Sequence, residues 1–362
     1  MEKALNIVKN FDLSGEVDTI KPLGNGHINS TYLVKMSDGE KYTIQAINGY
    51  VFKDPASVMN NIVKVTEHIR KKLDSLGEDS SRGCLRVINS KSGLPYFKDE
   101  EGVFWRAYSF IDEASTYDNA DDPKTLYNAG FGFGKFQRQL SDIDASALCE
   151  TIPDFHNTPK RFENLVNAIK ADKLQRVKTC PEVIDFYLSR EKEMSYLTDM
   201  RKTGELPIRV THNDTKFNNI LIDDKTGDAL AVIDLDTVMP GLATDDFGDA
   251  IRFCANTAEE DETDINKIHF DMKRYESFAD GFLTGVGGNL TNKEIEALPY
   301  GAKIITMEIG MRFLTDYLEG DVYFKVHREG HNLDRAINQA TLAASMERHF
   351  DEMKDYVKKY LK

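Results

Sequence analysis

The chain of 362 residues has few cysteines, no long apolar run and no cluster of basic residues. Its four cysteines lie far apart, without the paired spacing of a zinc site or a disulfide framework, so we expect reduced thiols. No apolar stretch reaches the length of a membrane span. The first residues, MEKALNIVKNFDLSGEV, are too acidic and too interrupted for a signal peptide. We therefore expect a cytoplasmic protein that does not enter a membrane.

The charge balance excludes a further class of partner. With 46 basic and 60 acidic residues, the formal net charge is −14. A surface of that sign repels phosphates unless a basic patch is concentrated somewhere, so we expect no nucleic-acid partner. Hydrophobic residues make up 41% and charged residues 29%, which is ordinary globular composition in a chain long enough for two lobes.

The first hundred residues have the pattern of a small sheet with one helix. Segments 17–23, 29–36 and 41–48 are short, rich in β-branched and aromatic residues, and separated by turn formers. Apolar residues at helical spacing then predict a helix over 54–73, and 84–88 and 103–111 read as two more strands. After a polar connector at 112–122 the pattern is mainly helical, with helices expected near 126–140, 181–202, 265–285, 297–319 and 332–361.

This order predicts an α+β fold with two lobes. Residues 1–110 would form a β-rich N-lobe, and residues 111–362 a larger, mainly helical C-lobe.

A glycine turn lies between the first two predicted strands. In GNGHIN, Gly24 and Gly26 would let the backbone approach a ligand and direct N–H groups at phosphate oxygens, although a plain hairpin turn explains them too. The Gly-Lys-Ser/Thr ending of a P-loop is absent from the chain. In kinase-like lobes the third strand carries a lysine that touches the phosphates, but Gln45 stands there. Either Gln45 contacts the phosphates without charge, or another cation compensates.

The segment THNDTKFNNIL has the spacing of a phosphoryl-transfer loop. His212, Asp214, Lys216 and Asn219 reproduce the pattern H-x-D-x-K-x-x-N of kinase catalytic loops. The carboxylate of Asp214 would accept the proton of the attacking hydroxyl, Lys216 would reach the transferred phosphate, and Asn219 would offer a metal ligand. The pattern therefore favours a bilobal protein-kinase-like fold.

Two acidic segments compete for the second metal ligand. A strand, a turn and a second strand separate Asn219 from Asp234, which favours Asp234 as a ligand of Mg²⁺, with Asp236 as a further candidate. The triplet Asp246-Phe247-Gly248 lies farther along the chain. We expect Asp246 to cap the helix that follows it, or to touch substrate.

These motifs resemble those of the phosphotransferase family that includes aminoglycoside, choline and homoserine kinases. The strings GHINSTYLV, RVTHNDTKFNNIL, IDLDTVMPG, DFGDAIRF and GMRFLTDYLEGDVYF look more specifically like those of the N-acetylhexosamine 1-kinases. The resemblance covers almost the whole chain. It implies an enzyme that phosphorylates the anomeric hydroxyl of N-acetylglucosamine or N-acetylgalactosamine with ATP and Mg²⁺.

The resemblance also implies roles for single residues. Asp214 would be the catalytic base, and Asn219 and Asp234 would hold Mg²⁺. The turn with Gly24, Gly26, His27 and Asn29 would cover the triphosphate, and the backbone around Phe110 and Ile111 would meet adenine. Arg312 and Tyr323 match positions near the sugar. The segment LATDDFG departs from the pattern at 243–245, which leaves the role of Asp245 open.

Several alternatives stay open. The same chemistry could serve an aminoglycoside, choline or another small alcohol, and Gln45 is the best argument for a non-catalytic nucleotide-binding scaffold. By spacing alone, Glu308, Arg312 and Asp316 could form a solvated ion-pair ladder on one helix face. The segment 151–162 reads as a structural loop. The gluco or galacto preference and the oligomeric state stay undetermined.

Overall fold

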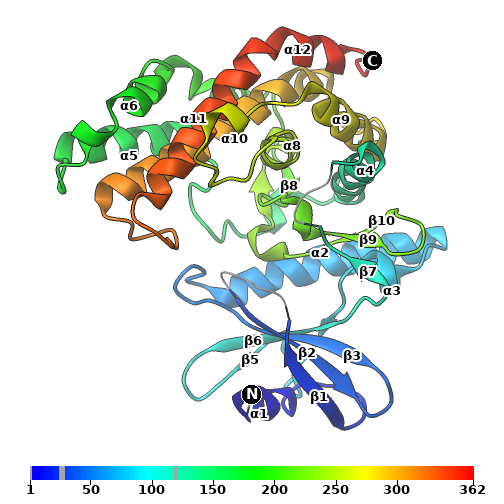
Figure 1. Ribbon diagram of the computed structural model, residues 1–362. Helices are drawn as coiled ribbons and strands as arrows, with labels where there is room; N and C mark the ends of the chain where they lie inside the picture. Colours follow the sequence, from blue (N-terminus) through cyan, green and yellow to red (C-terminus); the bar gives the residue numbers. More distant parts are fainter. Residues whose placement is uncertain (1, 24–28, 118–120) are drawn as a thin grey trace. The chain divides into compact units, whose positions relative to one another are not determined.

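The computed structural model describes residues 2–23, 29–117 and 121–362. They form a mixed α+β fold, with a sheet in the N-terminal region and helices in the C-terminal region, which confirms the predicted fold class (Figure 1). The chain divides into two compact units. The first unit comprises Met1–Thr116, Asp142–Pro153 and Ile220–Pro240, and the second comprises Tyr117–Ser141, Asp154–Asn219 and Gly241–Lys362. The lobe boundary expected at residue 110 stays a prediction.

An antiparallel sheet is the centre of the first unit. The described residues pair in the order β1-β2-β3-β6-β4, and β5 also pairs with β6. Val34, Ile44 and Trp105 lie in the core that this sheet covers, because alternate side chains point to one face. The strands are β1 (Val17–Pro22), β2 (Ser30–Met36), β3 (Lys41–Ala46), β4 (Val87–Ile88), β5 (Phe97–Lys98) and β6 (Phe104–Ser109).

Helix α2 (Pro55–Leu76) confirms the helix expected after the third strand. Asp54 caps its first turn by accepting a hydrogen bond from the Ser57 amide, and Gly77 ends it in the left-handed region at φ 70°. The predicted apolar face, from Val58 to Leu73, is buried. The short helices α1 (Glu2–Val8) and α3 (Ser80–Gly83) belong to the same unit.

A small hairpin completes the first unit. β9 (Ile220–Asp223) and β10 (Ala229–Val232) are antiparallel, with Ile220 opposite Val232, and β7 (Ala114–Ser115) pairs with β9. This is the strand, turn and strand expected between Asn219 and Asp234. The hairpin leads into a 3₁₀ turn, Leu235–Thr237, and β11 (Met239–Gly241) follows.

The described part of the second unit is mainly helical and contains the short strand β8 (Arg209–Thr211). Its longest helix packs against α8 and α11, and α4 packs along α9 (Figure 1). The helices are α4 (Pro123–Gln139), α5 (Thr158–Ala171), α6 (Pro181–Leu188), α7 (Tyr196–Thr203), α8 (Ala243–Cys254), α9 (Met272–Val286), α10 (Asn292–Glu319), α11 (His331–Arg348) and α12 (Phe350–Lys358), and short 3₁₀ turns lie at 145–147, 177–179, 191–193, 217–219 and 265–267.

Two of the expected long helices are each broken in two. The helix expected over 181–202 ends at Leu188, because Arg190 turns back to donate to the Phe186 carbonyl and to bind Glu347. The helix expected over 332–361 breaks at His349, where α12 changes direction and packs on α9 and α10. Both breaks depend on tertiary contacts that helical spacing does not reveal. None of the described helices has both the length and the apolarity needed to cross a bilayer.

Candidate active site

The predicted catalytic loop follows β8 and closes with a 3₁₀ turn at Phe217–Asn219. Asn213 adopts the left-handed region at φ 65°, a conformation that non-glycine residues rarely take and that is often found at functional sites. This bend immediately precedes Asp214.

Asp214, Lys216 and Asn219 lie together, as the spacing required. The Lys216 Nζ is 3.1 Å from the Asp214 Oδ1. The Asn219 Nδ2 donates to the Asp214 carbonyl at 2.9 Å and lies 3.3 Å from its Oδ2. Burial alone would raise the pKa of Asp214, but the charges of Lys216 and His212 outweigh it, so the pKa lies below its usual value. Asp214 is thus held as a carboxylate, and its side chain remains 25% exposed.

Asp246 supports this loop from behind. Its Oδ2 and Oδ1 accept hydrogen bonds from the backbone amides of His212 and Asn213 at 3.0 and 2.7 Å, and Gln137 also donates to it. The expectation that Asp246 caps its helix was wrong, because α8 already begins at Ala243 and Asp246 lies inside the first turn. Since both carboxylate oxygens bind protein donors, Asp246 serves the loop's conformation. Its contact with substrate stays a prediction.

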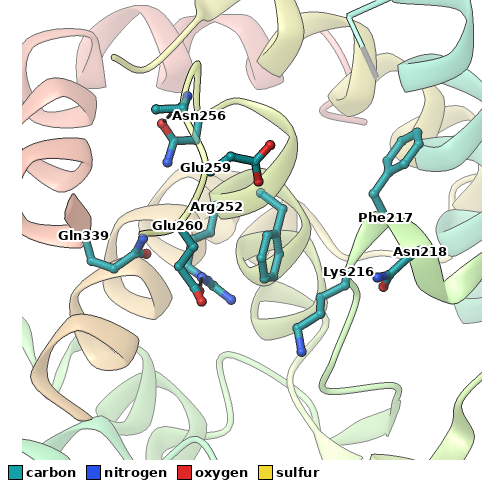
Figure 2. Close-up of a pocket in the computed structure, with 10 residues that line it drawn as sticks. Lys216, Phe217, Asn218, Arg252, Asn256, Glu259, Glu260 and Gln339 are labelled. Atoms are coloured by element: carbon teal, nitrogen blue, oxygen red, sulfur yellow. Dashed lines mark hydrogen bonds and ion pairs between the residues drawn. The ribbon is translucent and has the colours of Figure 1, made fainter. Parts of the chain in front are cut away.

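A pocket of about 350 Å³ opens beside Lys216 in the second unit (Figure 2). The Arg252 guanidinium carbon lies 3.9 Å from the ring centroid of Phe253, and Arg252 is paired with Asp249 at 3.1 Å and Glu260 at 2.5 Å. Among the described atoms, the buried Oε1 of Gln339 has no hydrogen-bond partner. The pocket is lined by Lys216, Phe217, Asn218, Arg252, Phe253, Asn256, Ala258, Glu259, Glu260 and Gln339.

Arg312 does not belong to a solvated ladder. Its guanidinium lies 5.4–5.8 Å from the ring centroids of Phe155, Tyr323 and Phe324. The neighbouring acids of the same helix are buried, which rules out the ladder. Asp316 accepts hydrogen bonds from the backbone amides of residues 322–324 and so holds the segment that carries Tyr323. The side chain of Tyr323 is exposed.

Glu308 binds the segment that was expected to be only a structural loop. His156 Nδ1 lies 2.9 Å from Glu308 Oε1, and His156 Nε2 lies 3.3 Å from the Asn213 carbonyl oxygen. Burial lowers the pKa of His156, but the charge of Glu308 outweighs it and raises the pKa to about 9. His156 therefore connects α10 to the residue before Asp214.

Asp245, whose role the sequence left open, is buried near this pair. Burial raises its pKa to about 7, and the charge of His156 offsets part of that rise. The Leu242 backbone amide donates a hydrogen bond of 3.3 Å to the Asp245 Oδ2 at the start of α8. The His156, Glu308 and Asp245 group is a buried titratable cluster behind the catalytic loop.

The first unit contains a second network, centred on Asp236. Arg106 on β6 forms an ion pair with the Asp236 Oδ1, and the Asn29 Nδ2 donates to the Oδ2 at 2.7 Å. Gln45 accepts a hydrogen bond from Arg106 Nε at 3.0 Å and donates to Thr31 Oγ1 at 2.9 Å. Both oxygens of Asp236 are therefore bound by protein donors, and its role as a metal ligand stays a prediction, as does phosphate contact by Asn29 or Gln45.

Asp234 adopts the left-handed region at φ 57° and ψ 57°, immediately after the hairpin. Burial alone would lower the pKa of Arg106. The negative charge of Asp236, and more weakly that of Asp234, outweighs burial, so the pKa lies above its ordinary value. Arg106 is thus the shared counter-charge of the two acids.

The remaining predicted nucleotide contacts lie at the end of β6 or in a segment that is not described. The Phe110 amide donates to the Lys41 carbonyl at 3.0 Å, and Ile111 is buried. Their contact with adenine stays a prediction. Gly24, Gly26 and His27 lie outside the described residues.

Sequence reasoning did not single out Arg106, His156 or Arg252, and it considered Glu308 only as a member of an ion-pair ladder. Arg106 lies in a segment read only as a strand, and His156 in a segment without motif spacing. For Arg106 a signal was present, because one of the two alternatives left by Gln45 was that another cation compensates for the missing lysine. No spacing pattern joins His156 to Glu308, because the two residues lie 152 apart in the chain. Arg252 has a partner, Asp249, three residues before it, but that spacing alone did not mark it as part of a site.

Comparison with known proteins decides the family. Residues 19–278 match the sequence profile of the Phosphotransferase enzyme family (APH). The chain belongs to this family. The match begins in β1, spans the rest of the sheet, α2, the catalytic loop and both acidic segments, and ends in the first half of α9, so the chain is a kinase-like phosphotransferase.

Solved structures show the same fold at low identity. An aminoglycoside phosphotransferase from Alicyclobacillus acidocaldarius superposes with a TM-score of 0.63 at 11% identity, covering 98% of this chain and 96% of that one. A microcompartment-associated aminopropanol kinase gives 0.60 at 14% identity, covering 98% of each chain. An amicoumacin kinase in complex with AMP-PNP, Ca²⁺ and Ami gives 0.57 at 13% identity, covering 98% and 93%. At these identities the likeness concerns the fold.

Proposed function

We propose that this phosphotransferase transfers the γ-phosphoryl group of ATP to the anomeric hydroxyl of N-acetylhexosamines, giving the sugar 1-phosphate and ADP. The observation that carries the proposal is the Asp214, Lys216 and Asn219 arrangement in a chain of this family. The resemblance of five sequence segments to N-acetylhexosamine 1-kinases supports the choice of acceptor.

In this mechanism Asp214 accepts the proton of the attacking hydroxyl. Its depressed pKa keeps the carboxylate ionised, and its partial exposure leaves room for an acceptor. Lys216 lies close enough to share its charge between Asp214 and the transferred phosphoryl group. Asp246 and His156 both hold the backbone of Asn213, the residue immediately before Asp214, so the base is positioned before substrate arrives.

The expected metal ligands, Asn219 and Asp234, carry oxygen atoms of the kind that Mg²⁺ prefers. The Nδ2 of Asn219 donates to the Asp214 carbonyl, and the Asn219 amide oxygen and the Asp234 carboxylate would hold the ion. When bound, the ion would offset the charge of the β- and γ-phosphates.

The pocket beside Lys216 favours an acceptor without net charge. Its lining contains two basic residues, Lys216 and Arg252, and two acidic residues, Glu259 and Glu260, so the formal charges balance. A polycationic aminoglycoside would require an excess of acids. Hydroxyl and acetamido groups instead suit the amides and the Phe253 ring.

The test is ADP release with N-acetylglucosamine, N-acetylgalactosamine, glucose, kanamycin, choline and aminopropanol, each with Mg²⁺ and ATP. The N-acetylhexosamines should give turnover, and ³¹P NMR of the product should show a phosphate coupled to the anomeric proton. Turnover with choline, aminopropanol or kanamycin alone would contradict the sugar assignment. A phosphate on C6 would contradict the anomeric assignment.

A further inference from the structure

The N-terminal sheet lacks the lysine of kinase-like lobes but buries a different cation. Gln45 stands on β3, and its register partner on β6 is Arg106. Directly paired residues of antiparallel strands place their side chains on the same face. The Arg106 guanidinium therefore reaches the end of the Gln45 side chain, with the Nε 3.0 Å from the Oε1.

The acidic partner of the kinase lysine is also missing. In protein kinases that lysine pairs with a glutamate of the neighbouring helix. In α2 the buried polar residues are Asn61 and Thr66, and Asn61 donates to the carbonyls of Cys149 and Val238 at 2.7 and 3.0 Å. The acids of α2, Glu67 and Asp74, are exposed.

The first unit instead contains a buried ion pair between β6 and the 3₁₀ turn that follows Asp234. Arg106 pairs with Asp236, and the two side chains are 1% and 6% exposed. Among the ion pairs described within the first unit, no other has both side chains less than a tenth exposed. Such a pair is costly to bury, and removing one partner leaves an uncompensated charge.

We propose that Arg106 replaces the missing strand-3 lysine, as a positioning residue that fixes Asp236 and thereby the turn that presents Asp234 to the nucleotide–metal complex. The inference rests on the proposed kinase function. It does not depend on the identity of the acceptor.

The connections of Asp236 explain how the effect would be transmitted. Its Oδ1 binds Arg106 and its Oδ2 binds Asn29, whose Oδ1 in turn accepts the Asn48 amide at 3.0 Å. Asp236 thus joins β6, the start of β2 and the 3₁₀ turn that follows Asp234. Without the guanidinium, Asp236 would be a buried, partly unpaired carboxylate close to Asp234, and the turn at φ 57° would lose its anchor.

The experiment measures equilibrium binding of Mn²⁺ with AMP-PNP to the full chain, by the electron paramagnetic resonance of free Mn²⁺. Arg106→Met should weaken binding at least tenfold, and Arg106→Lys should weaken it less. The double variant Gln45→Lys/Arg106→Met returns a cation to β3 and should recover part of the loss. In turnover, Arg106→Met should raise the KM for ATP while leaving the KM for the acceptor unchanged.

Arg82→Met is the matched control, because Arg82 pairs with Asp223 at 2.7 Å elsewhere in the first unit. It should lower the melting temperature without changing Mn²⁺–AMP-PNP binding. A folded Arg106→Met variant that binds within twofold of wild type would overturn the inference, as would an equal loss in Arg82→Met. Should Arg106→Met fail to fold, the double variant decides: folding without recovered binding would overturn the inference. Failure of wild type to bind nucleotide would instead refute the proposed function.

Discussion

At the residue scale, the catalytic loop is held by buried groups that each have a defined partner. Asp246 accepts hydrogen bonds from two backbone amides of the catalytic loop. His156 contacts both the Asn213 carbonyl oxygen of this loop and Glu308 on α10. A buried carboxylate is stable only when it is well paired, so these acids exchange hydration for fixed hydrogen bonds. The loop's conformation consequently depends on residues that touch no substrate.

The His156–Glu308 pair predicts a pH-dependent contribution to stability. The pKa of His156 rises from 6.5 to about 9 on folding. Its protonated form therefore stabilises the fold fully below pH 6.5, and this contribution is lost as pH rises through 9. The stability difference between wild type and His156→Gln should shrink by about 1–3 kcal/mol over this window. Urea unfolding at pH 6 and pH 9.5 measures it.

His269→Gln is the control for that measurement, because His269 is exposed and its ring contacts the Asn266 carbonyl rather than the catalytic loop. A wild-type advantage over His156→Gln that is constant from pH 6 to 9.5 would contradict the assignment of a protonated His156.

Arg312 offers a prediction about acceptor binding. Arg312→Ala should raise the KM for N-acetylhexosamine about tenfold, the effect of losing roughly 1.4 kcal/mol, and leave the KM for ATP near its wild-type value. Steady-state kinetics with each substrate varied in turn measures both constants. Arg176→Ala, which removes a guanidinium stacked 4.6 Å from Tyr317 in the same unit, should change neither. An equal rise in both constants for Arg312→Ala would argue against a sugar contact.

At the element scale, close helix packing positions the site. Helix α8 carries Asp245, Asp246 and Arg252, and it lies against α10 where Gly301 faces Thr244. A Cβ at Gly301 would clash with the Thr244 carbonyl oxygen, so only glycine permits this approach. In α9, Gly281 meets the Tyr127 carbonyl oxygen of α4 in the same way.

Alanine substitutions at the two glycines distinguish an effect on stability from an effect on activity. Gly281→Ala and Gly301→Ala should each destabilise the fold by about 1–3 kcal/mol, because neither backbone can yield freely. Gly301→Ala should also lower turnover of the folded fraction, since it displaces α8 and with it the acids behind the catalytic loop. Gly281→Ala should leave that turnover near wild type. Melting temperatures combined with kcat below the melting transition measure both effects, and equal turnover in the two variants would contradict the role given to α8.

Prediction from sequence succeeded where local spacing determines the outcome. The apolar face of α2, the strands of the small sheet and the grouping of Asp214, Lys216 and Asn219 all follow from residues close together in the chain. The breaks at Arg190 and His349 did not follow, because distant partners such as Glu347 and α9 cause them. The Arg106–Asp236 pair joins residues 130 apart in the chain, beyond what periodicity can detect.

At the scale of the whole molecule, nucleotide binding should be visible as added stability. A ligand that binds only the folded state stabilises it by RT ln(1 + [L]/Kd), or about 2.7 kcal/mol at a hundred times Kd. Mg²⁺ with AMP-PNP should therefore raise the melting temperature by several degrees, and chelation of the divalent ion should remove most of the gain. An increase that chelation leaves unchanged would contradict the metal set of Asn219 and Asp234.

The central claim is that Asp214 activates the attacking hydroxyl, and single-turnover phosphoryl transfer with Asp214→Asn tests it most directly. General-base catalysis typically contributes about 10²–10⁴-fold. The rate with N-acetylhexosamine should fall by at least the lower figure while the affinity for ATP stays within a few fold of wild type. Asp228→Asn, at an exposed turn, should leave both unchanged. An Asp214→Asn variant that transfers phosphate at the wild-type rate would contradict the account.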